Sequence, residues 1–227
     1  MIFKQLFDTK SSTYTYIIAS AKGREAMIID PVIENVGEYI KLLKELDLKL
    51  VKVIDTHIHA DHVTGASKLK LATNCSTLMG EHTPADAVEI KVKDDEIIKI
   101  DQIEIKAMYT PGHTSDSYSF LMDNYLFSGD TLLINGTGRT DFQNGNSKDA
   151  YNSIFNKLLK LPDETLLYPA HDYKGEKVST IGKEKKYNPR LQVKNADQYI
   201  EIMSNLNLSK PQMIDHNISR NLKLGKI

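Results

Sequence analysis

Four apolar segments of strand length in this chain each run into a loop that carries histidine or aspartate. Segment 50–55 precedes the stretch 56–62, segment 103–109 precedes His113, segment 125–128 precedes Asp130, and segment 166–168 precedes His171. Buried strands that end in loops commonly present functional residues at their carboxyl ends, and imidazole with carboxylate is a typical ligand set for a transition metal. The sequence therefore predicts a fold in which these loops form a metal-dependent site.

The stretch 56–62, Thr-His-Ile-His-Ala-Asp-His, is the densest of the four loops. Three of the seven histidines of the chain fall within it. Residues two apart at a strand end point to the same side, so the side chains of His57, His59 and Asp61 are expected to converge. His62 belongs to the next turn and is expected to approach from another direction. The alternative is a polar loop with ordinary histidines, which such clustering makes the weaker interpretation.

Strand and helix patterns interleave at both ends of the chain, with a run of strands between them. Helices are expected at 36–46, 63–71, 149–161 and, as the last element, 195–206; further strands are expected at 14–19, 25–30, 77–79, 97–100 and 118–122. Neither a simple parallel sheet nor an all-β sandwich fits this order. Two mixed sheets flanked by helices fit better, in a single domain that covers residues 1–227.

Composition excludes several classes of function. The 29 basic and 30 acidic residues among 227 give a net charge of -1, which argues against a nucleic-acid partner and against a membrane surface. Cys75 is the single cysteine, so no internal disulfide can form, and no basic residue or histidine beside it points to a nucleophile. The N-terminal residues do not form a signal peptide. We expect a soluble cytoplasmic protein.

The motif at 56–62, together with the three later loops, resembles the metallo-β-lactamase superfamily over nearly the whole chain. The resemblance implies an αββα sandwich, which agrees with the two mixed sheets expected from the pattern. Within the superfamily, the segments 138–143, 171–173 and 188–191 are similar to the persulfide dioxygenase branch. That branch oxidises glutathione persulfide with O2 to sulfite and glutathione and uses one Fe(II) per chain.

Carried over residue by residue, the resemblance makes His57, His113 and Asp130 the iron ligands, a set of two histidines and one carboxylate that leaves positions open on the metal. The remaining candidates then lie around the iron or complete a second metal site: His59, Asp61, His62 and His171. In hydrolases of the superfamily the full set holds two zinc ions. A binuclear-zinc thioester hydrolase resembling glyoxalase II is therefore the alternative. A homodimer is expected only by analogy with relatives.

Arginine is rare in this chain, with four residues against 25 lysines. Arg139 and Arg190 fall in motifs shared with the branch, and both are interpreted as contacts to substrate carboxylates, for which a guanidinium is a better geometric match than an ammonium. The alternative for each is an internal ion pair, for instance with Asp141 or Asp172.

Tyr173 is expected to bind substrate and, with His171, to act in catalysis; its alternative is a packed core aromatic. His82 and His216 stand outside all motifs and are expected at the surface. Thr137 occupies a position where some relatives carry cysteine. The sequence contains no fused rhodanese-like domain, so the persulfide is expected to come from another source.

Overall fold

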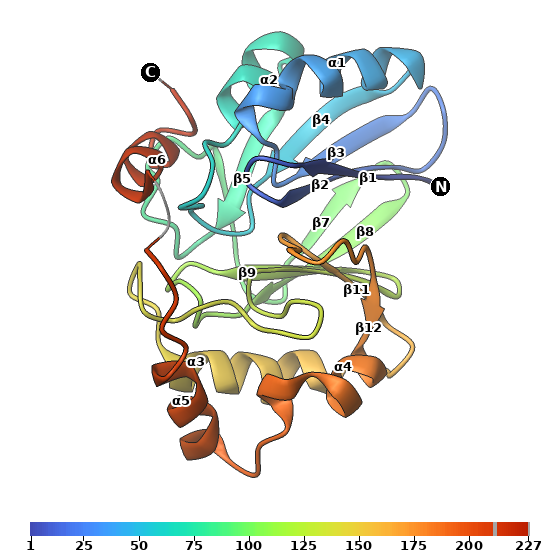
Figure 1. Ribbon diagram of the computed structural model, residues 1–227. Helices are drawn as coiled ribbons and strands as arrows, with labels where there is room; N and C mark the ends of the chain where they lie inside the picture. Colours follow the sequence, from blue (N-terminus) through green and yellow to red (C-terminus); the bar gives the residue numbers. More distant parts are fainter. Residues whose placement is uncertain (211–212, 227) are drawn as a thin grey trace.

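The computed structural model describes residues 1–210 and 213–226 and places two six-stranded sheets face to face (Figure 1). The first sheet has the order β1-β2-β3-β4-β5-β6 and the second the order β12-β11-β10-β9-β8-β7. Both sheets are mixed. In the first, β3 to β6 pair in parallel, while β1 pairs antiparallel with β2 and β2 antiparallel with β3. In the second, β10 and β11 pair in parallel and the other neighbouring strands pair antiparallel. The predicted fold class is confirmed.

The strands of the first sheet are β1 (Ile2–Asp8), β2 (Thr13–Ala19), β3 (Glu25–Ile29), β4 (Lys49–Ile54), β5 (Ser76–Gly80) and β6 (Ile90–Val92). Those of the second are β7 (Ile97–Ile100), β8 (Ile103–Tyr109), β9 (Tyr118–Met122), β10 (Tyr125–Gly129), β11 (Leu166–Pro169) and β12 (Ser179–Thr180). The apolar side chains between the sheets, among them Ile54, Phe120 and Phe127, form one buried core.

Helices cover the outer face of each sheet (Figure 1). On the first sheet lie α1 (Val36–Glu45) and α2 (Ala66–Thr73), which pack on the β-strands through side chains such as Tyr39 and Leu69. On the second lie α3 (Ser147–Asn152), α4 (Ile181–Tyr187) and α5 (Ala196–Ser204). Their core includes Ile154, Ile181 and Tyr199. The helix expected at 149–161 is present, and it continues past α3 as η2 (Ser153–Lys157) and η3 (Leu158–Lys160).

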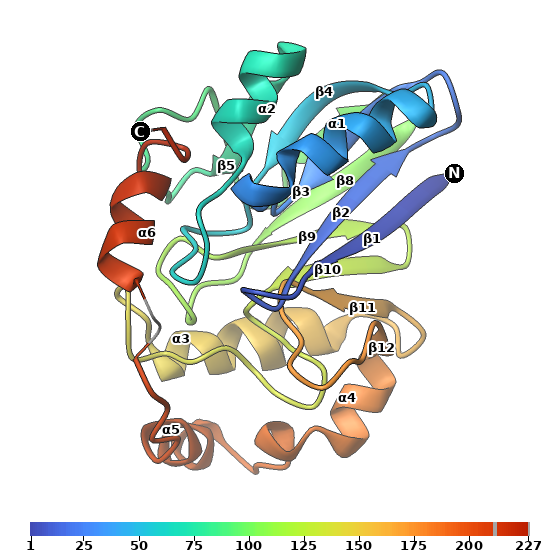
Figure 2. The same cartoon turned by 45° about the horizontal axis from the view of Figure 1, so that its top comes forward.

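The prediction that the helix at 195–206 is the last element is wrong. After α5 the chain forms α6 (Ile214–Asn221), which lies beside α2 and β5 of the first sheet (Figure 2). Only two apolar residues of α6, Ile214 and Ile218, pack inward, and two asparagines are buried on the same face. Such a short polar helix has too little apolar periodicity to be recognised from sequence.

Candidate metal centre and its cavity

The four loops that carry the predicted ligands meet, as expected. The stretch 56–62 follows β4 of the first sheet, whereas His113, Asp130 and His171 follow β8, β10 and β11 of the second. Three groups of potential ligand atoms form, each within 4.8 Å. The first is His57 with His113 and Asp130, the second is His59 with Asp61 and His62, and the third joins His59 to Asp30 and Asp55. The site thus lies between the two sheets at one end of the sandwich, and every metal-ligand candidate from the sequence is in it.

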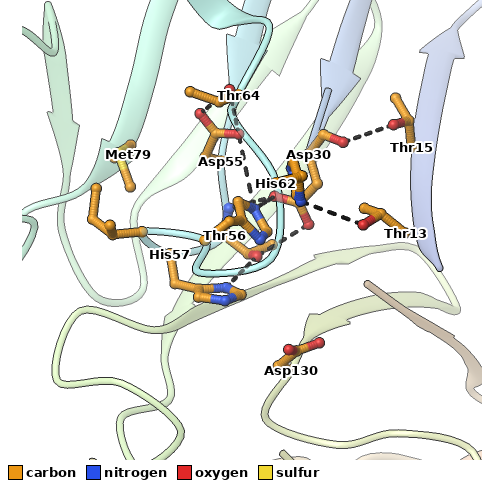
Figure 3. Close-up of polar contacts among 12 residues, drawn as sticks. Thr13, Thr15, Asp30, Asp55, Thr56, His57, His62, Thr64, Met79 and Asp130 are labelled. Carbon is orange, nitrogen blue, oxygen red and sulfur yellow. Dashed lines mark hydrogen bonds and ion pairs between the residues drawn. The ribbon is translucent and has the colours of Figure 1, made fainter. Parts of the chain in front are cut away.

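In the first group, hydrogen bonds fix which imidazole nitrogen faces the metal position. Nδ1 of His113 donates to the carbonyl oxygen of Arg139 at 2.7 Å. The hydroxyl of Thr56 donates to Asp30 at 3.0 Å and therefore accepts from Nδ1 of His57, also at 3.0 Å (Figure 3). Because Nδ1 donates a hydrogen bond in both rings, Nε2 is the nitrogen of each ring that can bind a metal.

Electrostatics favour the protonation states of His57 and Asp130 that suit a bound cation. Burial, and then the neighbouring His59 and His113, hold the pKa of His57 well below its ordinary range. Although burial alone would raise the pKa of Asp130, His171 and His113 lower it well below the usual value. A neutral imidazole and an ionised carboxylate are the forms that bind metals.

In the second group, His59 is turned toward carboxylates. Its Nε2 lies 3.1 Å from Oδ1 of Asp30 and 3.9 Å from Asp55. Burial opposes the charged ring, but the carboxylate of Asp30 prevails and raises the pKa of His59 to about 9. Nδ1 of His59 and Nε2 of His62 are buried and have no hydrogen-bond partner among the described residues. Buried polar atoms are seldom left unpaired, so these two nitrogens are further candidate ligand atoms.

His171 connects the first group to the second. Its Nδ1 lies 2.6 Å from Asp130 and its Nε2 2.9 Å from Asp61. Burial favours the neutral ring, but both carboxylates raise the pKa of His171 well above its usual value. The ring is therefore held as a cation between two anions, and both its nitrogens are engaged as hydrogen-bond donors.

Residues of the first and second groups of ligands line a cavity of about 980 Å³, a volume at the upper end of the range for small-ligand sites. All three predicted substrate residues line it: Arg139, Tyr173 and Arg190. Tyr173 is 72% exposed, with its ring parallel to that of His171 at 6.1 Å, so its alternative as a packed core aromatic is wrong. His216 is exposed as expected, but it also lines the cavity, which the sequence did not indicate.

The two predicted substrate arginines differ in their surroundings. Arg139 forms a two-point ion pair with Asp141, at 2.6 and 2.7 Å, and also donates to the carbonyl oxygens of Leu208 and Ser209. The internal ion pair considered as its alternative is therefore present, and its contact to substrate stays a prediction. Arg190 has no such carboxylate partner among the described residues; it donates to the carbonyl oxygen of Thr137.

Several residues that support the site were not predicted. Thr13 of β2 hydrogen-bonds to Asp61, His62 and His171. Asn221 of α6 donates to the carbonyl oxygens of both His59 and His62, at 2.8 Å each. No local signal marks a threonine in a strand or an asparagine in a helix as part of a distant loop, because these contacts depend on tertiary structure.

Comparison with known proteins agrees with this geometry. Residues 8–171 match the family model described as metallo-beta-lactamase superfamily. The human protein "Persulfide dioxygenase ETHE1, mitochondrial" is 39% identical over 228 residues, which cover 99% of this chain and 89% of that protein. The hydroxyacylglutathione hydrolase of Dictyostelium discoideum is 34% identical and covers 70% of this chain and 62% of that protein.

Among solved structures, the crystal structure of ETHE1 from Myxococcus xanthus superimposes with a TM-score of 0.97, at 45% identity and with complete coverage of both chains. Likeness of this extent includes the whole sandwich, the metal loops and the C-terminal helices. The chain belongs to the metallo-β-lactamase superfamily and, within it, to the persulfide dioxygenase branch.

Proposed function

We propose that this chain is a persulfide dioxygenase that oxidises glutathione persulfide with O2 at one Fe(II) held by His57, His113 and Asp130. The observation that carries the proposal is the arrangement of these three residues: two histidines that both present Nε2 and one ionised carboxylate, within 4.8 Å of one another. The relatives named persulfide dioxygenase, similar over the whole chain, support the same activity.

The donor set fits a single non-haem iron. Two imidazoles and one carboxylate leave open positions, and iron bound there supplies sites where O2 and the substrate sulfur can meet. His171 favours one metal over two, because both its nitrogens hydrogen-bond to carboxylates. As a neighbour of Asp130, it fixes the orientation of that carboxylate and holds a proton near the reacting atoms.

The reaction balances without a further reductant. One glutathione persulfide, one O2 and one water give one glutathione and one sulfite with two protons. The terminal sulfur is oxidised by four electrons, which reduce O2, and the sulfur–sulfur bond breaks. In this scheme Arg190 binds a substrate carboxylate, and the exposed hydroxyl of Tyr173 contacts substrate at the cavity mouth beside His171. Arg139 contributes less to substrate binding, because Asp141 already pairs with it.

A binuclear-zinc thioester hydrolase is the second candidate. It is favoured by the group of His59, Asp61 and His62, where two buried nitrogens lack partners. The hydroxyacylglutathione hydrolase relative points the same way but covers less of this chain. Against it stands His171, both of whose ring nitrogens hydrogen-bond to carboxylates.

The two functions are separated by presenting both substrates to the same preparation. We expect O2 uptake and sulfite release when glutathione persulfide is added to protein purified without oxygen, and no hydrolysis of S-lactoylglutathione above background. Rapid hydrolysis of the thioester without persulfide-dependent O2 uptake would replace the proposal with the hydrolase.

Cellular location and assembly stay predictions. No helix in the described part of the chain has the length and apolar character to cross a membrane. We propose a cytoplasmic enzyme that can form a homodimer, although the name of the human relative places that protein in mitochondria.

A further inference from the structure

Two of the four arginines lack a carboxylate partner among residues 1–210 and 213–226, and both line the cavity. Arg24 pairs with Asp101 and Arg139 with Asp141. Arg190 and Arg220 form no ion pair in the described part of the chain, yet both are cavity residues. Guanidinium groups that line a cavity without an internal anion are suited to bind an anionic ligand.

The two arginines come from elements that pack on different sheets. Arg190 lies in η4 (Pro189–Leu191), next to Leu191, which packs in the core beneath the second sheet. Arg220 lies on α6, which is beside the first sheet (Figure 2) and packs against its core through Ile218. His113 and Asp130 line the same cavity. A ligand held by both arginines would therefore span the cavity that contains the metal ligands.

Both side chains are half-buried and have donors to spare. Arg190 donates one Nη to Thr137, and Arg220 donates Nη2 to the carbonyl oxygen of Gly225 at 3.2 Å. Nε of Arg220 is buried and has no hydrogen-bond partner among the described residues. A buried donor without a partner is costly, and a carboxylate that accepts from it would remove that cost.

We propose that Arg220 is a second anion-binding residue of this cavity and that it and Arg190 each hold one terminal carboxylate of the thiol carrier. The inference rests on the proposed function, since glutathione carries one carboxylate at each end and its sulfur in the middle. With both ends held, the sulfur lies over His113 and Asp130. Binding of the carrier at both ends positions the reacting sulfur and favours carriers that have two carboxylates.

The test measures glutathione binding by titration calorimetry to the metal-bound protein. Two analogues each lack one carboxylate: the glycyl ethyl ester of glutathione, and 4-aminobutanoyl-cysteinyl-glycine. We expect Arg220→Gln to weaken glutathione binding about tenfold or more, because a charge-assisted hydrogen bond is lost. With one of the two analogues the same substitution should change the affinity less than twofold, since the carboxylate it holds is absent. In turnover, KM for the persulfide should rise, and kcat should fall because the sulfur is held less well.

The control is Lys223→Gln, which removes the same charge from an exposed residue of the same segment that does not line the cavity. It should bind glutathione as the wild-type protein does. Arg220→Lys, which keeps the charge but not the planar fork, should fall between wild type and Arg220→Gln, and the thermal unfolding midpoint of each variant shows whether it is folded.

Three outcomes would overturn the proposal. They are no glutathione binding by the wild-type protein, an unchanged affinity in Arg220→Gln, or an equal loss with glutathione and both analogues. The proposed function fails separately. If glutathione binding depends on Arg220 as expected but the persulfide consumes no O2, the anion site stands and the dioxygenase does not.

Discussion

Gly138 lies where no larger residue fits beside the metal ligands. A Cβ atom there would overlap the carbonyl oxygen of Asp130 and lie 2.9 Å from Nδ1 of His113, and the amide of Gly138 donates to that same carbonyl at 2.8 Å. The loop after β10 is thus folded tightly against two of the three proposed iron ligands. Space, rather than backbone conformation, requires glycine at this position.

Gly138→Ala is therefore expected to displace both ligands and to weaken metal binding about 10- to 100-fold, the usual cost of disturbing the residues behind metal ligands. Gly136→Ala is the matched control, because a Cβ there meets nothing closer than 3.9 Å. The metal content of the two variants is measured after dialysis against increasing concentrations of chelator. Equal metal retention in the two variants would show that the close packing at Gly138 has no bearing on the ligands.

At the level of secondary-structure elements, α6 lies outside the two sheets and contacts the loop 56–62, which carries metal-ligand candidates. The amide of Asn221 donates to the carbonyl oxygens of His59 and His62, while its oxygen accepts from the backbone amide of Thr64. Asn217 donates to the carbonyl oxygen of Ala60 in the same loop. Through these hydrogen bonds the helix holds the backbone of the loop 56–62 in place.

Asn221→Asp should destabilise the protein by about 2–3 kcal/mol, because a buried acceptor would then face two carbonyl oxygens. It should also release metal more readily than wild type. Asn205→Asp, the same change at an exposed residue after α5, should do neither. Urea unfolding and chelator titration together check this. If Asn221→Asp and Asn205→Asp have the same stability and the same metal retention, α6 does not hold the loop 56–62 in place.

The elements that were predicted from sequence differ in kind from those that were not. Strands such as β2 and β4 have continuous β-branched and apolar runs, and their carboxyl ends carry the ligands, so both the fold and the metal loops could be predicted. In contrast, β1 has the adjacent polar residues Lys4 and Gln5 between two apolar pairs and so lacks the alternation of a strand, and α6 is mostly polar. These elements are stabilised by partners far away in sequence, and for that reason the contact of Asn221 with the metal loop could not be foreseen.

At the scale of the whole molecule, one ion pair joins the two sheets away from the site. Arg24, in the connection between β2 and β3, donates Nε to Asp101 at 2.9 Å, and Asp101 lies in the turn between β7 and β8. Hydrogen bonds from Arg24 and then Ser20 lower the pKa of Asp101 to about 2. A carboxyl group whose pKa is lowered on folding stabilises the protein above its unfolded-state pKa, and this contribution is lost as the pH falls through the folded-state value.

Asp101→Asn should therefore lower the thermal midpoint by about 1–3 °C at neutral pH, the range for an exposed ion pair in a chain of this size. The difference from wild type should be constant from pH 8 to 5 and fall by about half near pH 3. Asp123→Asn, in the turn between β9 and β10, should show no such trend. A difference between wild type and Asp101→Asn that stays the same at pH 3 would contradict the ionic origin of the effect.

Elemental analysis of protein purified without oxygen measures whether His57, His113 and Asp130 hold a single iron. We expect about one iron per chain in the wild-type protein and in His62→Ala, and loss of that iron in His113→Ala. Two zinc ions per chain in the wild-type protein, one of which is lost in His62→Ala, would contradict a single-iron site and make the second group of ligands part of a binuclear site.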